Sequence, residues 1–171
     1  YKRAINYHKN LYSKNKTKNK IEFKSTNKIR VGYVSANFND HPVLKVMESI
    51  FKEHDKTQFE IFAYYLNEIE DENTLKIKKY FKSFRNIGSL SINESIEEIR
   101  SDELDIAVDL MGYTNKNRME IFNKRIAPIQ INYLGFPGTT GAPNMDYLIA
   151  DKFVIPPDYK KYYSENIIYM P

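Results

Sequence analysis

The stretch SANFNDHP, residues 35–42, combines residue types that can hold or activate a ligand. Pro42 can occupy the first turn of a following helix, which leaves Asp40 or His41 near the N-cap. The free N–H groups at such a helix start attract an anion or a sugar hydroxyl. His41 can then act as a general base or donate to a substrate oxygen. The alternative is that Asp40 only caps the helix and His41 is a surface imidazole; the local sequence leaves both open.

A second stretch, LGFPGTTGAPN at residues 134–144, lies between two runs typical of buried strands, PIQINYL and MDYLIA. A tight hairpin needs only two turn residues, so a loop of this length requires another explanation. Glycine permits backbone angles and close approaches that other residues do not, and proline removes donors and stiffens the chain. The loop can present main-chain groups and threonine hydroxyls to a ligand, or it can be an irregular connection between strands.

Several kinds of site are missing from the sequence. The three histidines, His8, His41 and His54, include no pair at metal-ligand spacing, so no metal site is expected. No G-x-G-x-x-G, Walker or G-x-S-x-G sequence occurs, so any nucleotide phosphate is expected to bind in another part of the protein. His54 stands beside Asp55 at a predicted helix end, where a cation is favourable.

Runs typical of strands and helices alternate along the chain, and they must position these loops. Strands are predicted at 29–35, 59–66, 84–88, 104–112, 129–135, 145–151 and 166–170. Helices are predicted at 42–55, 72–83, 91–102, with a Ser91/Glu94 capping box, and 116–125. Such alternation implies βαβ units, and apolar runs such as IAVDL suit strands covered on both faces. The predicted fold class is α/β, a Rossmann-like parallel sheet with helices on both faces.

Ligands of an open parallel sheet bind beyond the carboxyl ends of its strands. Three conspicuous segments follow predicted strands: SANFNDHP at 35–42, MGYTNKNR at 111–118 and GFPGTTGAPN at 135–144. Because the carboxyl ends of parallel strands meet at one edge, we expect these three loops to converge on one cleft.

The charge is unevenly distributed along the 171 residues. The net charge is +4, but residues 2–30 carry ten basic side chains and one acidic one. We expect residues 1–27 to be a terminal helix and a Lys/Asn-rich linker from a preceding region, and residues 28–171 to be one Rossmann-like lobe. The basic stretch can bind nucleic acid or an anionic surface, but a solvated linker is the preferred interpretation, with neither nucleic acid nor membrane as partner.

The absence of cysteine excludes disulfides and a cysteine nucleophile, and it suits a cytoplasmic, reducing compartment. No apolar run approaches the roughly 18 residues of a membrane span, and nothing resembles a signal peptide. The first residue is Tyr1 rather than methionine. We therefore expect a piece of a longer, cytoplasmic protein.

Four segments carry a resemblance to a known family: IRVGYVSANFNDHPV, DLMGYT, RIAPIQINYLGFPGTTGAPNMDYLIADKFVIPP and YYSENIIYMP. Together they run from about residue 29 to residue 171 and resemble the O-linked N-acetylglucosamine transferases and their SPINDLY-type relatives. The resemblance implies the N-terminal lobe of a GT-B glycosyltransferase, preceded by tetratricopeptide repeats and followed by a second lobe that holds most of the nucleotide. It implies inverting transfer of a sugar from a nucleotide-sugar, UDP-GlcNAc foremost, to Ser/Thr hydroxyls of acceptor proteins, without a required metal or other cofactor.

The resemblance also assigns roles to single residues. It places His41, as the catalytic candidate, and Pro42 beside the donor sugar and acceptor, and Leu134 and Gly135 beside the sugar. The other substrate-binding candidates are Asn37, Pro137, Gly138 and Thr139. Asn37 replaces an aspartate that is usual in the family, and an amide cannot accept a proton at neutral pH. The isolated lobe is expected to be inactive.

Two alternatives stay open. One is a related transferase that uses GDP-fucose as donor or a non-protein acceptor. The other is a degenerate, non-catalytic binding module, which Asn37 and the Val43-Leu44-Lys45 sequence after the His-Pro pair would suit.

Overall fold

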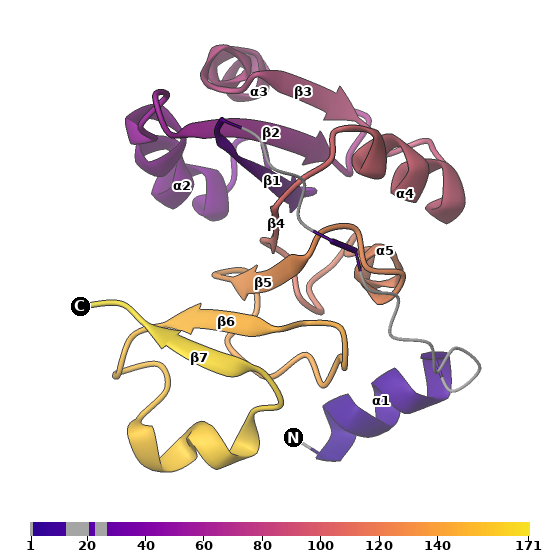
Figure 1. The fold of residues 1–171 in the computed structure, drawn as a ribbon, viewed down its shortest axis with the longest axis vertical. Coiled ribbons are helices and arrows are strands. Elements are labelled where there is room, and N and C mark those ends of the chain that lie inside the picture. Colours follow the sequence, from indigo (N-terminus) through magenta and orange to yellow (C-terminus); the bar gives the residue numbers. More distant parts are fainter. Residues whose placement is uncertain (1, 13–20, 23–26) are drawn as a thin grey trace.

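The computed structural model describes residues 2–12, 21–22 and 27–171, which contain one seven-stranded sheet and its helices (Figure 1). The strands are β1 Ile29–Ser35, β2 Phe59–Tyr65, β3 Ser83–Asn86, β4 Ile106–Asp109, β5 Ile129–Tyr133, β6 Tyr147–Ala150 and β7 Asn166–Tyr169. The α-helices are α1 Lys2–Tyr12, α2 Pro42–Glu53, α3 Glu72–Ile77, α4 Ile92–Ser101 and α5 Met119–Asn123. All neighbouring strands are parallel, in the order β3-β2-β1-β4-β5-β6-β7. The predicted Rossmann-like fold is confirmed.

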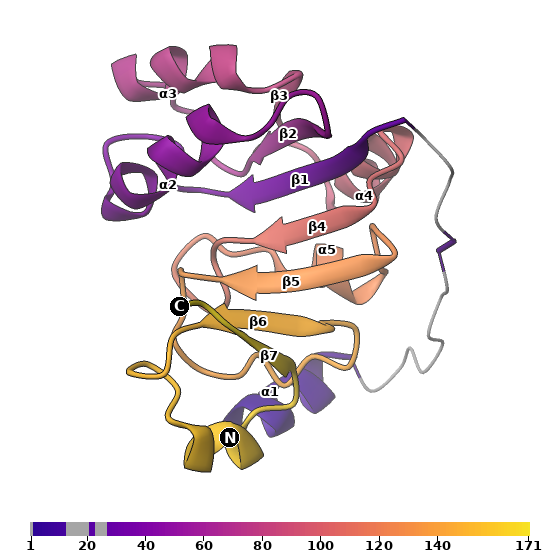
Figure 2. The same ribbon diagram turned by 60° about the vertical axis from the view of Figure 1, so that its left-hand side comes forward.

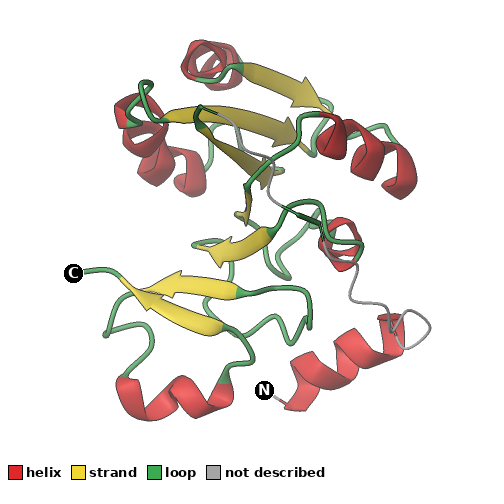
Figure 3. Cartoon of the chain, in the orientation of Figure 1, coloured by secondary structure: helices red, strands yellow, loops and turns green. Residues whose placement is uncertain are grey.

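Helices cover both faces of the sheet, as predicted (Figure 3). On one face, Met47 and Phe51 of α2 share a core with Tyr33 of β1. On the other face, Ile99 of α4 shares a core with Val34, the next residue of the same strand. Successive side chains of a strand point to opposite faces, so β1 contributes to both cores and lies at the centre of the domain.

Side-chain hydrogen bonds fix where α3 and α4 begin. In the predicted capping box of α4, Glu94 N donates to Ser91 Oγ at 3.3 Å and Ser91 N donates to Glu94 Oε2 at 2.8 Å. Asp71 and Thr74 make the same reciprocal pair at the start of α3. These contacts satisfy N–H groups that a helix start leaves without partners.

Two short helical segments differ from the prediction. The helix predicted over 72–83 is α-helical only to Ile77 and continues as a 3₁₀ helix to Tyr80. A second 3₁₀ helix, Pro157–Tyr162, was not predicted. Its first residue is proline, whose fixed φ suits a helical start.

α5 is shorter than the helix predicted over 116–125, because its first residues form a turn. Lys116 has a positive φ of 61°, outside the helical region. Asn117 Nδ2 donates to Thr114 O at 2.7 Å, which competes with a helical path. The helix therefore begins only after this turn.

The Gly/Pro-rich loop is a crossover between two parallel strands. β5 and β6 are paired in parallel, with Asn132 opposite Leu148, so the chain must return across the sheet before β6 begins. Elsewhere in such folds a helix makes this return; here residues 134–146 do so without a helix or strand (Figure 3). This explains why the loop is longer than a hairpin turn.

α1 lies beside the part of the sheet that contains β6 and β7 (Figure 2). The terminal helix predicted at residues 1–12 is thus found over Lys2–Tyr12. Most of the predicted Lys/Asn-rich linker, residues 13–20 and 23–26, lies outside the described residues. Within the described part of the chain, no helix has the length and apolar character needed to cross a membrane.

Candidate functional site

The loops after β1, β4 and β5 meet at the carboxyl edge of the sheet, as predicted. These strands are parallel neighbours, so their carboxyl ends lie side by side. Leu110 N donates to Val34 O at 3.1 Å, which joins the ends of β4 and β1. Gly135, after β5, lies directly against the main chain of Leu110. The three loops therefore form one continuous surface.

His41 is the N-cap of α2, and Pro42 is the first residue of the helix. The backbone N–H of Val43 donates to His41 Nδ1 at 3.2 Å. Because Nδ1 accepts this hydrogen bond, the neutral ring carries its proton on Nε2. No described residue hydrogen-bonds to Nε2. The half-buried imidazole therefore offers an N–H donor to a ligand oxygen, which suits the donor role better than the general-base role.

Asp40 does not cap α2. The interpretation in which Asp40 caps the helix and His41 is only a surface imidazole is therefore wrong. Its exposed carboxylate pairs with Lys45 Nζ at 3.0 Å. Its backbone N–H donates to Asp71 Oδ2 at 2.7 Å, which ties the loop to the start of α3. These contacts hold Asp40 away from the cap position and leave that position to His41.

Met111 joins the loop after β1 to the loop after β4. Its sulfur accepts weak hydrogen bonds from Ser35 Oγ at 3.5 Å, Ala36 N at 3.3 Å and Asn37 Nδ2 at 3.5 Å. The side chain of Asn37 thus lies at this junction, half-buried. Its amide can position a ligand but cannot take a proton.

Asp109, at the end of β4, is a buried carboxylate that sequence reasoning did not single out. It accepts hydrogen bonds from Met111 N at 2.9 Å, Gly112 N at 2.8 Å and Asn132 Nδ2 at 2.9 Å. Burial raises the pKa of Asp109 to about 6, because desolvation outweighs these hydrogen bonds. The side chain fixes the loop after β4 against β5. The signal in the sequence is a single acidic residue within the buried run IAVDL, since such a residue needs partners.

Leu134 and Gly135 form a tight turn at the end of β5. Leu134 has a φ of 72°, and Gly135 N donates to Tyr133 O at 2.9 Å, which closes a three-residue turn. A Cβ on Gly135 would lie 2.1 Å from Leu110 O, so only glycine fits. The turn leaves the Leu134 side chain 37% exposed at the same edge as His41.

Pro137, Gly138 and Thr139 continue this loop, with different surroundings. Pro137 is exposed, and its carbonyl oxygen accepts a hydrogen bond from Tyr163 OH at 3.0 Å. Thr139 is only 5% exposed, and its hydroxyl donates to Glu165 Oε2 at 2.7 Å. The Thr139 hydroxyl thus has a partner inside the protein, and the sugar contacts expected of these three residues stay predictions.

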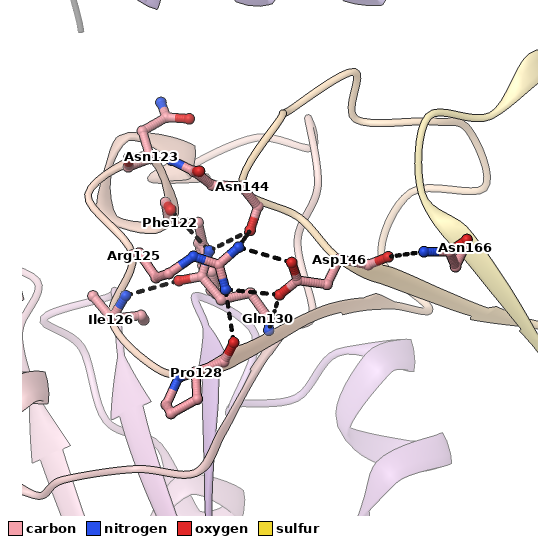
Figure 4. A network of polar contacts seen from close by, with 9 residues as sticks. All are labelled: Phe122, Asn123, Arg125, Ile126, Pro128, Gln130, Asn144, Asp146 and Asn166. Atoms are coloured by element: carbon pink, nitrogen blue, oxygen red, sulfur yellow. Dashed lines mark hydrogen bonds and ion pairs between the residues drawn. The ribbon is translucent and has the colours of Figure 1, made fainter. Parts of the chain in front are cut away.

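The far end of the crossover is held by a polar network at the amino edge of the sheet (Figure 4). Arg125 binds Asp146 with two hydrogen bonds, Nη1 to Oδ2 at 2.9 Å and Nη2 to Oδ1 at 2.7 Å, and its Nη1 also donates to Pro128 O at 2.7 Å. The buried amide of Gln130 donates to Asn144 O at 2.7 Å. The crossover is therefore anchored at both ends.

Of the other two histidines, His54 is half-buried and His8 is buried. Tyr33 OH and His54 Nε2 share a hydrogen bond at 2.7 Å, and burial lowers the pKa of His54. The expected preference for a cation at this helix end is wrong, because desolvation dominates. His8 of α1 is buried, and its pKa is lowered by burial although the charge of Glu165 acts in the opposite direction. Among the described residues, no three His, Cys, Asp or Glu side chains are grouped to hold a metal ion.

The chain is similar to known proteins in sequence and in overall fold. The family described as Glycosyl transferase family 41 matches residues 2–171. The probable UDP-N-acetylglucosamine–peptide N-acetylglucosaminyltransferase SEC of Arabidopsis thaliana is 39% identical over 147 residues, which are 84% of this chain and 15% of that protein. The UDP-N-acetylglucosamine–peptide N-acetylglucosaminyltransferase of Caenorhabditis elegans is 36% identical over 146 residues, 84% of this chain and 13% of that protein.

A solved structure of a Thermobaculum terrenum O-GlcNAc transferase mutant has a TM-score of 0.81 and 32% sequence identity to this chain. The match covers 84% of this chain and 28% of that one. The chain thus spans only a minor part of its relatives' length. Since the family match covers the chain from α1 to the last residue, the chain belongs to glycosyl transferase family 41.

Proposed function

We propose that this chain is the N-terminal catalytic lobe of an inverting glycosyltransferase that transfers GlcNAc from UDP-GlcNAc to Ser/Thr hydroxyls of acceptor proteins. The observation that carries the proposal is the meeting of three strand-end loops at one edge, with the Nε2–H of His41 available there. The names of the relatives from Arabidopsis thaliana and Caenorhabditis elegans support this choice of donor and acceptor.

Each part of the edge has a role in this proposal. His41 donates from Nε2 to an oxygen of the sugar or the acceptor, and Pro42 holds it at the helix start. The turn at Leu134 and Gly135 places main-chain groups beside the sugar. Asn37 contacts substrate but does not act as base, so the residue that accepts the acceptor's proton lies outside these positions. The nucleotide-sugar is a substrate, and neither a metal nor another cofactor is required.

The proposal extends to the longer protein. A helical-repeat region precedes this lobe and α1 is its last helix; a second lobe follows and holds the nucleotide, which agrees with the lack of a phosphate-binding sequence here. The partners are these two regions and the acceptor proteins. We place the enzyme in the cytoplasm, in keeping with a chain that has no cysteine.

A donor panel tests the proposal. The full-length protein is incubated with cell extract and radiolabelled UDP-GlcNAc, UDP-glucose or GDP-fucose, and the 171-residue chain serves as a control. Label incorporated into protein from UDP-GlcNAc, by the full-length protein only, supports the proposal. If label is incorporated from GDP-fucose instead, the enzyme is a fucosyltransferase and not a GlcNAc transferase. If the full-length protein neither uses nor binds any donor, it is a non-catalytic binding module.

A further inference from the structure

Glu165 is a buried carboxylate that accepts hydrogen bonds from two residues of the crossover loop, Thr139 and Thr140. It lies just before β7 and is 3% exposed. Its Oε2 accepts from Thr139 Oγ1 at 2.7 Å and from Ser164 Oγ at 3.2 Å. Its Oε1 accepts from the backbone N–H of Thr140 at 2.7 Å and from the hydroxyl of the same residue. One side chain thus holds two consecutive residues of the loop.

The two threonine hydroxyls are also acceptors for the loop's own backbone. Thr139 Oγ1 accepts from Gly141 N at 3.1 Å, and Thr140 Oγ1 accepts from Ala142 N at 3.2 Å. An ionised carboxylate can only accept hydrogen bonds. Glu165 therefore draws both hydroxyl protons toward itself and leaves the oxygen lone pairs for these N–H groups. The carboxylate in this way sets the backbone path of residues 139–142.

This braced segment is connected to the candidate site on two sides. Along the chain it leads back to the turn at Leu134 and Gly135. Across space, Tyr113 OH donates to Thr140 O, and Tyr113 belongs to the loop after β4 that also carries Met111. The brace therefore contacts two of the three loops that meet at the carboxyl edge.

We propose that Glu165 is a positioning residue for sugar binding: it holds Thr139 and Thr140 so that the loop places Leu134 and Gly135 correctly, without itself touching the sugar. The inference rests on the proposed function, and neither the fold match nor the family resemblance assigns Glu165 this role. Loss of the brace lets the loop drift, and a misplacement of about 1 Å can reduce turnover about a hundredfold.

Glu165→Gln in the full-length protein tests the proposal. The amide keeps the shape but presents an NH₂ group to hydroxyls that must donate. Asp102→Asn is the matched control, because Asp102 is also a poorly exposed carboxylate with several donors, Tyr64 OH at 2.7 Å and Arg85 Nη2 at 2.7 Å, on the other half of the sheet. Hydrogen exchange of residues 134–142 and kcat/KM for the donor are measured for each variant.

We expect Glu165→Gln to raise exchange in 134–142 and to reduce kcat/KM about tenfold or more, while Asp102→Asn changes neither. Thr140→Val should reproduce the effect and Thr140→Ser, which keeps the hydroxyl, should not. Equal behaviour of Glu165→Gln and Asp102→Asn in both measurements would overturn the positioning role. If the unmodified protein uses no donor, the proposed function fails, and exchange in 134–142 alone decides whether Glu165 holds the loop.

Discussion

A methyl group added at Gly135 collides with the main chain of the neighbouring strand end. The new Cβ would lie 2.1 Å from Leu110 O, 2.7 Å from Leu110 C and 2.8 Å from Met111 Cα. Carbon and oxygen in contact lie at about 3.3 Å or more, so the two backbones would have to separate by roughly 1 Å. Neither side can relax by rotating a side chain, because both partners are backbone. Gly135→Ala therefore forces apart the loops after β4 and β5.

The magnitude follows from the cost of overpacking. Extra atoms in a well-packed region typically cost about 1–3 kcal/mol, and we expect the upper end of that range here. In a chain of this size each kcal/mol lowers Tm by about 2–4 °C, so Gly135→Ala should melt about 6–12 °C lower. Thermal unfolding followed by far-UV circular dichroism measures this.

Gly138→Ala is the control within the same loop. Its Cβ would lie 2.8 Å from Phe136 Cε1, an atom of a side-chain ring that can rotate away. The substitution also restricts the unfolded chain, which contributes about 0.4–1 kcal/mol of stability, so Tm should change little. A Gly135→Ala variant that melts within about 2 °C of the unmodified chain, or one that is more stable than Gly138→Ala, would show that the two backbones do not collide.

Three further predictions concern the residues that hold the site. His41→Ala should lower the free energy of unfolding by about 1 kcal/mol, and His41→Asn, which keeps an N-cap acceptor, should lower it much less. Both substitutions should reduce turnover of the full-length enzyme about tenfold or more. Turnover retained in His41→Asn would rule out a role for the imidazole. Because the pKa of Asp109 is raised from 3.8 to about 6, its stabilising contribution is complete below about pH 4 and is lost as pH rises through about 6, by up to about 3 kcal/mol. The free energy of urea unfolding of the unmodified chain, taken relative to that of Asp109→Asn, should show this fall between pH 4 and 7, because the lowered pKa values of His8 and His54 add the opposite trend to both proteins; parallel profiles would contradict the assignment. Arg125→Met should lower the free energy of unfolding, measured by urea unfolding, by about 3 kcal/mol. A loss below about 1 kcal/mol would mean that the Arg125–Asp146 pair does not anchor the crossover.

The order of the elements could be predicted because it depends on local patterns. β1 begins and ends where the apolar run IRVGYVS does, and α4 begins at the predicted Ser91 cap. The meeting of the three loops follows from parallel pairing alone, since equivalent strand ends then share one edge. The family resemblance assigned substrate contacts to residues at that edge, and these contacts stay predictions.

What could not be predicted depends on contacts between distant residues. His41 rather than Asp40 caps α2 because Asp71, far along the chain, captures the Asp40 N–H. The inward orientation of Thr139 depends on Glu165, which no local pattern connects to it. The lowered pKa of His54 likewise depends on its packing against Tyr33, whereas the sequence showed only its place at a helix end.

The burial of His8 bears on where this protein can be cut. The boundary predicted at residue 27 assigns α1 to the preceding region, and His8 of α1 is 4% exposed and lies within reach of the Glu165 charge. A truncated protein that started at residue 28 would open that flank of the lobe to solvent. α1 therefore packs against this lobe, also as the last helix of a preceding region, and a version intended for crystallisation or ligand-binding measurements should keep it.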